Sequence, residues 1–296
     1  MQNYLQKIQA LKPENALYVV ATPIGNLADI SLRALQILQN VDFIVCEDSR
    51  VSMRLLSAYE IKEKKLLIYN DHSDEKMRKK ALEILCSGQS LALVSDAGTP
   101  LISDPGYKLV SFLRKFNQKV IPLPGPSSLT SALCASGIAC DNFLFLGFLP
   151  TSEIQKKKLL KSLPKNFTFA FFEAPNRVVE SLELIKENLG NRLCCAAREL
   201  TKIHEEICSD EVENLLKFFA ENPQKLRGEF VIIVEKAAKD EKSFSQDELL
   251  AEISKSLAAG VSLKDLSQNL SEIFDINKKD VYGLALEISK KDECKK

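Results

Sequence analysis

The chain has 296 residues, of which 45% are hydrophobic and 27% are charged, as is ordinary for a folded soluble protein. Its length predicts about two domains, with room for a small additional one. The formal net charge is zero, which argues against a protein that coats nucleic acid without discrimination, because such binding depends on neutralising phosphates.

Short apolar runs alternate with amphipathic segments in the first part of the chain. The apolar and β-branched content of these runs, with turn residues after each, predicts strands at residues 17–21, 43–46, 66–69, 91–94 and 119–123. Helical spacing of apolar residues predicts helices at residues 31–39, 74–86 and 105–117. This alternation predicts an α/β lobe over residues 17–123, preceded by an N-terminal extension of residues 1–16.

A second α/β lobe is expected over residues 124–236. Apolar runs predict its strands at residues 143–147, 167–172, 193–197 and 230–235. Helical patterns predict helices at residues 176–188 and 210–221. The segment PLPGPSS at residues 122–128 is expected to form the hinge between the two lobes.

The end of the chain changes character. Residues 237–244 are charged and predict a linker, and residues 245–296 predict a helical domain. Three apolar stripes mark its helices: Leu250, Ile253 and Leu257; Leu263, Leu266 and Leu270; Val281, Leu284, Ala285 and Ile288. Gly260 separates the first two helices, and Asn277 is placed to cap the third. Three short helices suit a helix-turn-helix-like bundle, acting either as a structural cap or as an RNA contact.

Cysteine usage and apolar runs indicate the compartment. The eight cysteines include no CxxC pair, and His72 and His204 are the two histidines, so we expect reduced thiols and no metal site. The first sixteen residues lack the apolar core of a signal peptide, and no apolar run is long enough to span a bilayer. We therefore expect a soluble, cytoplasmic protein with no membrane partner.

Three loops that follow predicted strands carry small, turn-forming and acidic residues. They are TPIGN at residues 22–26, EDSR at residues 47–50 and SDAGTPLISDPG at residues 95–106. Each of the first two alone could be a plain turn, but the third is longer than ordinary connections. Ligands of open α/β sheets bind outside the carboxyl ends of strands, so the set predicts a site for a small polar ligand.

Eight segments occur in order along the chain: LYVVATPIGNLADISLRAL, VCEDSR, LVSDAGTPLISDPGYKLV, PLPGPSS, GFLP, FFEAPNRV, ARELTKIHEE and LRGEFVIIVE. Together they resemble the ribosomal RNA small subunit methyltransferase I family, within the tetrapyrrole methylase fold class, over residues 17–235. The C-terminal helices resemble that family's small helix-turn-helix-like domain. The sequence departs from the family pattern at two places. It has EDSRVS where the family has EDTRHT, and it has Asn70, Asp71 and His72 where the family has HDH.

The resemblance implies a fold and an activity. The fold would be two α/β lobes with S-adenosylmethionine in the cleft between them. The activity would be 2′-O-methylation of a cytidine in the decoding region of small-subunit (16S) rRNA, with free rRNA or the 30S particle as partner and a homodimer as the working form.

The resemblance also implies which residues bind the cofactor. They are Ser95, Asp96, Ala97, Gly98, Leu101, Ser127, Ser128, Phe148, Leu149, Glu173, Ala197, Arg198, Gly228 and Glu229. A hydroxyl is a weak nucleophile, so a base would assist, and the candidates are Asp29, Asp48 and His72. His72 is equally well explained as a solvated loop residue. Candidate contacts to the RNA are Asn26, Arg50 and Arg177, since guanidinium groups pair with phosphates.

A basic run follows GFLP on a predicted helix, at Lys156, Lys157, Lys158, Lys161 and Lys165. It indicates either a solvated helix face or an RNA-binding surface. Two rival functions stay open: a methyltransferase for a small tetrapyrrole precursor, and a non-catalytic RNA-binding protein of ribosome assembly. The added helical domain and the TPIGN and EDSR loops argue against the first rival, and intact loops on both lobes argue against the second.

Overall fold

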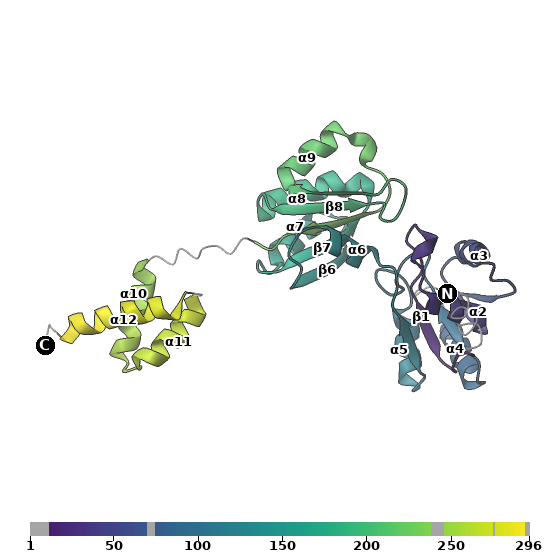
Figure 1. The fold of residues 1–296 in the computed structure, drawn as a ribbon, viewed down its shortest axis with the longest axis horizontal. Coiled ribbons are helices and arrows are strands. Elements are labelled where there is room, and N and C mark those ends of the chain that lie inside the picture. Colours follow the sequence, from purple (N-terminus) through teal and green to yellow (C-terminus); the bar gives the residue numbers. More distant parts are fainter. Residues whose placement is uncertain (1–11, 70–74, 238–245, 275, 294–296) are drawn as a thin grey trace. The chain divides into compact units, whose positions relative to one another are not determined.

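The computed structural model describes residues 12–69, 75–237, 246–274 and 276–293. The chain divides into two compact units, Met1–Lys236 and Ala237–Lys296. The first unit contains two lobes, each built on a five-stranded sheet with helices packed on it (Figure 1). The predicted α/β class is therefore confirmed.

The first lobe holds a fully parallel sheet with strand order β3-β2-β4-β1-β5. Its strands are β1 (Leu17–Val20), β2 (Phe43–Cys46), β3 (Lys65–Ile68), β4 (Leu91–Leu93) and β5 (Val120–Leu123). Its helices are η1 (Leu27–Asp29), α2 (Leu32–Asn40), α3 (Ser49–Ala58), α4 (Glu75–Cys86) and α5 (Tyr107–Lys115). The five predicted strands are confirmed, and no end differs by more than one residue.

Both faces of this sheet are covered, which explains why its strands are continuous apolar runs. Neighbouring residues of one strand enter opposite cores: Tyr18 packs with α2 and α3, whereas Leu17 packs with α4 and α5. The connection from β1 to β2 crosses the sheet towards β3, whereas the connection from β4 to β5 crosses it towards the opposite edge. The loops after the adjacent strands β1 and β4 therefore lie at a topological switch point, where ligands bind in such sheets.

The second lobe is a mixed sheet with strand order β6-β7-β10-β8-β9. Its strands are β6 (Phe143–Phe148), β7 (Thr168–Glu173), β8 (Leu193–Arg198), β9 (Glu206–Glu211) and β10 (Phe230–Val234). Its helices are α6 (Ser128–Ala135), α7 (Glu153–Ser162), η2 (Pro175–Arg177), α8 (Val178–Leu189), α9 (Val212–Glu221) and η3 (Pro223–Lys225). The central strand β10 runs antiparallel to both of its neighbours.

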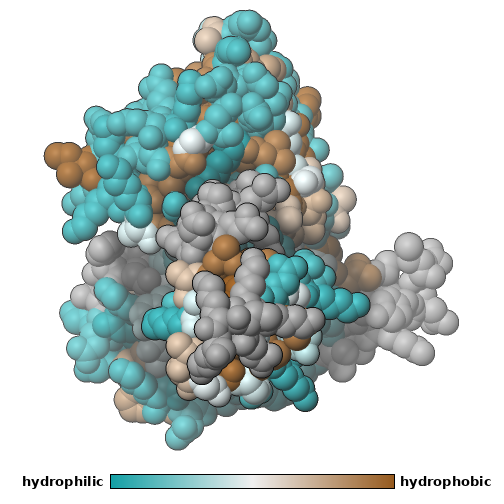
Figure 2. All heavy atoms as spheres, turned by 90° about the vertical axis from the view of Figure 1, so that its left-hand side faces the viewer, coloured by the Kyte–Doolittle hydropathy of each residue, from teal (hydrophilic) through white to brown (hydrophobic). Residues whose placement is uncertain are grey.

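The two faces of the second sheet have different covers. Helices α7, α8 and α9 bury one face, on a core that includes Phe169, Phe171 and Phe230, and α6 packs on the other face (Figure 1). Figure 2 shows hydrophilic side chains over most of the visible surface of this lobe, in the upper part of the view, with hydrophobic residues in small patches. Isolated apolar residues of this kind are ordinary on a folded domain.

The second unit is a three-helix bundle of α10 (Gln246–Ala258), α11 (Leu263–Phe274) and α12 (Lys278–Glu293). All three predicted stripes contribute to its core, except that Leu249 is buried in place of the predicted Leu250. The predicted cap is confirmed, since the Asn277 side chain accepts a hydrogen bond from the Lys279 amide at 2.9 Å. The expected linker lies almost wholly outside the described residues. No helix among the described residues is long and apolar enough to cross a membrane.

Candidate functional site

A cavity of about 370 Å³ lies within the first unit, between the loops of its two lobes. Its volume falls in the range of sites that hold a small organic ligand. The first lobe and the hinge contribute Ile24, Asp96, Ala97, Gly98, Thr99, Ile102, Ser103, Asp104, Ser127 and Ser128. The second lobe contributes Phe148, Phe172, Glu173, Ala174, Pro175, Glu199, Leu200, Lys202, Gly228, Glu229, Phe230 and Val231.

The loops after β1 and β4 are joined to each other by main-chain hydrogen bonds. The Thr22 amide donates to the Gly98 carbonyl at 2.8 Å, and the Gly98 amide donates to the Thr22 carbonyl at 3.0 Å. Thr22 is fully buried, and its hydroxyl donates to the Ser95 carbonyl at 3.3 Å. The two motifs TPIGN and SDAGTP thus form one rigid floor at the switch point of the first sheet.

The hinge is fixed to the same floor. The Thr99 hydroxyl donates to the Pro126 carbonyl at 3.0 Å. Gly125 leaves no room for a side chain, because a Cβ there would lie 2.9 Å from the Ala21 Cβ. The hinge segment therefore passes close against the end of β1 and brings Ser127 and Ser128, at the start of α6, to the cavity.

The long loop after β4 has an unusual backbone. Leu101 and Ser103 have φ angles of 74° and 66°, which side-chain-bearing residues rarely adopt. Gly106 ends the loop at a φ of 133°, with Leu93 Cδ2 only 2.9 Å from the position of a Cβ. Strained backbone persists only where the surroundings determine it, and it concentrates at functional sites. The carboxylate of Asp104 is carried on this loop.

A charged cluster forms the wall on the second lobe. The Lys202 Nζ lies 2.9 Å from Glu199 Oε1 and 3.6 Å from Glu229 Oε2, and the Glu229 amide donates to Glu199 Oε1 at 3.3 Å. The arrangement depends on Gly228, whose φ is 77° and whose Cβ would lie 2.1 Å from Glu199 Oε1. The loops after β8 and before β10 are therefore held together across the cavity wall.

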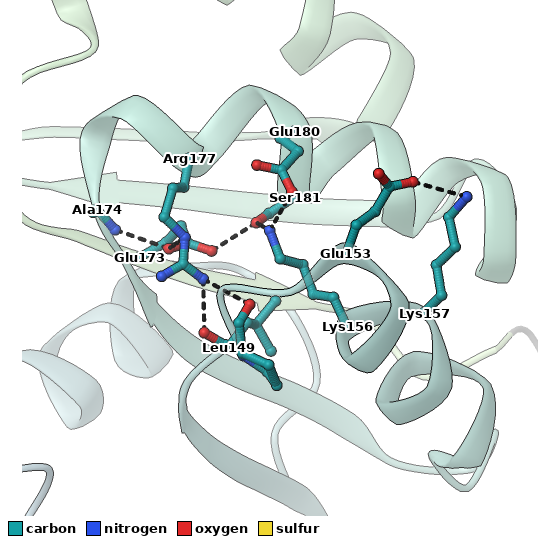
Figure 3. A network of polar contacts seen from close by, with 10 residues as sticks. Leu149, Glu153, Lys156, Lys157, Glu173, Ala174, Arg177, Glu180 and Ser181 are labelled. Carbon is teal, nitrogen blue, oxygen red and sulfur yellow. Dashed lines mark hydrogen bonds and ion pairs between the residues drawn. The ribbon is translucent and has the colours of Figure 1, made fainter.

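Glu173 ends β7 with a carboxylate that is completely buried (Figure 3). Its oxygens accept hydrogen bonds from the Ser181 hydroxyl at 2.6 Å and from the Ala174 amide at 3.0 Å. Arg177 Nε lies 3.1 Å from its Oε1. Glu173 thus belongs to the cavity wall, but its charge is already neutralised from within the lobe.

The guanidinium of Arg177 lies between two motifs of the second lobe (Figure 3). Besides contacting Glu173, it donates to the carbonyls of Leu149 at 2.6 Å and Pro150 at 3.1 Å. Its side chain is only 19% exposed. These contacts favour an internal role, joining GFLP to FFEAPNR, over the predicted contact of Arg177 with RNA phosphates.

The basic run on α7 is not a uniformly solvated face. Lys156 is completely buried, with its Nζ 2.7 Å from Glu180 Oε1 and 3.4 Å from the Ser181 Oγ (Figure 3). Lys157 pairs with Glu153 and Glu187. The prediction of a single solvated or RNA-binding stripe is therefore wrong for Lys156, whose charge is directed into the second lobe.

Asp104 is the partly buried carboxylate of the first-lobe wall. Burial raises the pKa of its carboxyl to about 6, the Ser95 side chain acts in the opposite direction, and the carboxylates of Glu47, Asp96 and Glu229 raise it further. A carboxyl of this kind is ionised at neutral pH but is a stronger base than an ordinary aspartate.

Of the fourteen predicted cofactor residues, the structure brings nine to the cavity lining. These are Asp96, Ala97, Gly98, Ser127, Ser128, Phe148, Glu173, Gly228 and Glu229. The other five do not line the cavity. The Ser95 hydroxyl donates to the carbonyls of Ala97 and Gly98, Leu101 packs on the first-lobe core, and Leu149 and Ala197 are buried. Arg198 pairs with Glu206 at 2.9 Å.

The predicted bases and RNA contacts lie elsewhere. Asp29 and Asn26 belong to the exposed η1 segment, where Asn26 caps the helix by accepting from the Ala28 amide. Asp48 caps α3 and pairs with Arg50, and this hydrogen bonding lowers the pKa of the Asp48 carboxyl to about 2. None of these four lines the cavity. His72 lies outside the described residues.

Thirteen residues of the lining were not predicted from the sequence. They are Ile24, Thr99, Ile102, Ser103, Asp104, Phe172, Ala174, Pro175, Glu199, Leu200, Lys202, Phe230 and Val231. All thirteen lie inside the motifs that carry the family resemblance, so the sequence indicated the right segments but not the single positions. A cavity is lined by whichever side chains the loop backbone turns inward, and that choice depends on the fold.

Comparisons with known proteins agree with this geometry. The tetrapyrrole (corrin/porphyrin) methylase family matches residues 16–216. The ribosomal RNA small subunit methyltransferase I of Rickettsia prowazekii is 46% identical over 75% of this chain and 78% of its own length. The protein of the same name from Pasteurella multocida is 42% identical over 92% of this chain and 96% of its own length.

Solved structures show the same fold at low identity. A cobalt precorrin-4 methyltransferase matches with a TM-score of 0.56 and 19% identity, over 76% of this chain and 98% of its own. A uroporphyrin-III C-methyltransferase from Thermus thermophilus, complexed with S-adenosylhomocysteine, matches with a TM-score of 0.51 and 16% identity, over 75% and 97%. By its sequence relatives and its fold, this chain belongs to the ribosomal RNA small subunit methyltransferase I family of tetrapyrrole methylases.

Proposed function

We propose that this protein transfers the methyl group of S-adenosylmethionine to the 2′-hydroxyl of a cytidine in the decoding region of small-subunit (16S) rRNA. One observation carries the proposal: the motifs through which the sequence resembles the rRNA small subunit methyltransferase I family supply the walls of the interlobe cavity. The proposal includes the rRNA or the 30S particle as partner, a homodimer as the working form and the cytoplasm as its location.

The lining of the cavity fits this cofactor. S-adenosylmethionine carries two positive groups, a sulfonium and an ammonium, and one carboxylate. In the lining, the carboxylates of Asp96, Glu199 and Glu229 outnumber the Lys202 cation. Apolar side chains, including Phe148, offer a surface for the adenine ring. When bound, the cofactor supplies an electrophilic methyl carbon. The residues of the chain would bind it, exclude water and orient the acceptor hydroxyl for in-line attack.

The acceptor is inferred from the relatives and from the extent of their match. The match to the Pasteurella multocida relative covers 92% of this chain. The first unit makes up a smaller share, 236 of the 296 residues, and the match must therefore extend into the helical unit. The tetrapyrrole-modifying structures cover only 75–76% of this chain. A tetrapyrrole precursor is therefore the weaker candidate.

Replacing Gly228 by alanine is expected to weaken S-adenosylmethionine binding by on the order of tenfold. The new Cβ would lie 2.1 Å from Glu199 Oε1, so the Glu199 side chain must leave Lys202 and the cavity wall must reshape. Isothermal titration calorimetry measures the loss. The matched control is Gly88→Ala, which has a similar φ of 82° but no atom within 4 Å of the Cβ position. Equal affinities in both variants would contradict this account of the wall.

The proposed function is tested by methyl transfer from labelled S-adenosylmethionine to small ribosomal subunits from cells that lack this gene. Primer extension that is sensitive to ribose methylation then maps the product. A new 2′-O-methylcytidine in the decoding region is the expected result. Incorporation into a precorrin-type substrate instead would identify a small-molecule methyltransferase. Cofactor binding without any transfer would favour a non-catalytic role in ribosome assembly.

A further inference from the structure

We propose that Asp104 is the catalytic base, accepting the proton of the acceptor hydroxyl as the methyl group is transferred. The inference rests on the proposed function and adds a residue to it. Three observations carry it: the position of Asp104 in the cavity wall, the fixed backbone of its loop, and the engagement of the other buried carboxylate of the lining in internal contacts.

The position of Asp104 is determined by the fold. It lines the cavity next to Ser103, and a Cβ at Gly147 would lie 3.5 Å from the Ser103 hydroxyl oxygen, so the two lobes approach each other here. Three residues away from Asp104, Leu101 packs into the core beneath the first sheet, and Gly106 admits no side chain. A carboxylate held in this way does not need to be oriented when the substrate arrives.

The remaining carboxylates of the lining are less suited to this role. Glu173 is saturated by Arg177, Ser181 and Ala174. Glu199 is paired with Lys202. Asp96 and Glu229 are exposed, so water solvates their carboxylates and the protein does not hold them in a buried position.

The electrostatic surroundings suit a base at neutral pH. Three carboxylates act on Asp104: Glu47 after β2, Asp96 after β4 and Glu229 before β10. The other charged residues of the cavity lining are Glu173, Glu199 and Lys202, on the second lobe. Burial and the carboxylates of Glu47, Asp96 and Glu229 raise the pKa of Asp104 to about 6. General bases are most effective when their pKa lies near the working pH.

The step balances without any further reactant. The hydroxyl oxygen of the acceptor forms a bond to the methyl carbon, the bond from that carbon to sulfur breaks, and its electron pair stays on sulfur. The hydroxyl proton passes to an oxygen of Asp104, and the neutral carboxylic acid loses it to solvent when the site opens.

The test is single-turnover methyl transfer to unmethylated small subunits by the wild-type protein and by Asp104→Asn. We expect the variant to be slower by roughly 10²–10⁴-fold, the usual contribution of a general base. The wild-type rate should fall as the pH drops below about 6, and the residual rate of the variant should lack that fall. Calorimetric affinity for S-adenosylhomocysteine should change little. The control is Asp141→Asn, because Asp141 is outside the cavity lining and pairs with Lys236.

Each other outcome overturns the proposal in a recognisable way. A variant that keeps the wild-type rate, or the wild-type pH dependence at a lower rate, shows that another group takes the proton. A variant that loses affinity for S-adenosylhomocysteine in proportion to its rate makes Asp104 a cofactor-binding residue. If the wild-type protein transfers no methyl group to small subunits, the proposed function fails and this proposal fails with it.

Discussion

Replacing Arg177 by methionine is expected to lower the free energy of unfolding of the first unit by roughly 3–5 kcal/mol, the usual cost of removing one partner of a buried ion pair. The Glu173 carboxylate has no exposed surface and would keep only the Ser181 hydroxyl and the Ala174 amide. The carbonyls of Leu149 and Pro150 would lose their donor as well. Urea unfolding followed by circular dichroism measures the change.

Two further variants sharpen this test. Arg50→Met removes a guanidinium from an exposed pair with Asp48, where we expect little change in stability, because solvent replaces the lost contact. Adding Glu173→Gln to Arg177→Met removes the buried charge and should restore part of the loss. If Arg177→Met instead kept full stability and weakened RNA binding, Arg177 would be a phosphate contact, as its sequence motif first indicated.

The ionisation of Asp104 is expected to destabilise the fold as the pH rises. Its carboxyl has an ordinary pKa of 3.8 and a pKa of about 6 in the folded protein, raised mainly by burial. Between these two values the folded protein binds more protons than the unfolded chain, so this carboxyl lowers stability as the pH rises through that window. The loss should reach on the order of 1–3 kcal/mol at neutral pH, the lower values reflecting partial solvent exposure.

Asparagine mimics the protonated carboxyl, so Asp104→Asn isolates this effect. The unfolding free energies of the variant and the wild-type protein should be similar near pH 4, should diverge as the pH rises to about 6, and should differ by a constant amount at higher pH, with the variant more stable. The measurement uses protein without ligand and is independent of turnover. A difference that stays constant across the pH range would show that Asp104 titrates normally and would remove one support of its catalytic role.

The strands were predictable because the first sheet is covered on both sides. Runs such as those of β2 and β4 must be apolar at every position, and turn residues follow each of them. Two elements that lack a clear apolar pattern were not predicted. The edge strand β9 has the sequence EICSDE, in which four of six residues are polar, and only its pairing with β8 identifies it. The short helix α3 was hidden by EDSR, which looked like a loop although Asp48 caps the helix.

The candidate site was predictable at the level of motifs and not of side chains. Asp96 and Asp104 lie in the same loop, and nothing in the sequence indicates that the first is exposed and the second partly buried. Lys156 is indistinguishable in sequence from its neighbours on α7, because its partners Glu180 and Ser181 follow 24 and 25 residues later. The packing of α7 against α8 decides both its burial and its pairing.

The reciprocal hydrogen bonds between Thr22 and Gly98 have a consequence for how this family can diversify. The two loops that meet there follow the neighbouring strands β1 and β4. We therefore expect the loops to take their conformation when the sheet forms, before a ligand binds. A substitution that reshapes the floor for a different substrate must also preserve these main-chain bonds, or the ends of β1 and β4 separate. Adaptation to a new acceptor is therefore freer at the rim, where exposed side chains can change without disturbing the sheet.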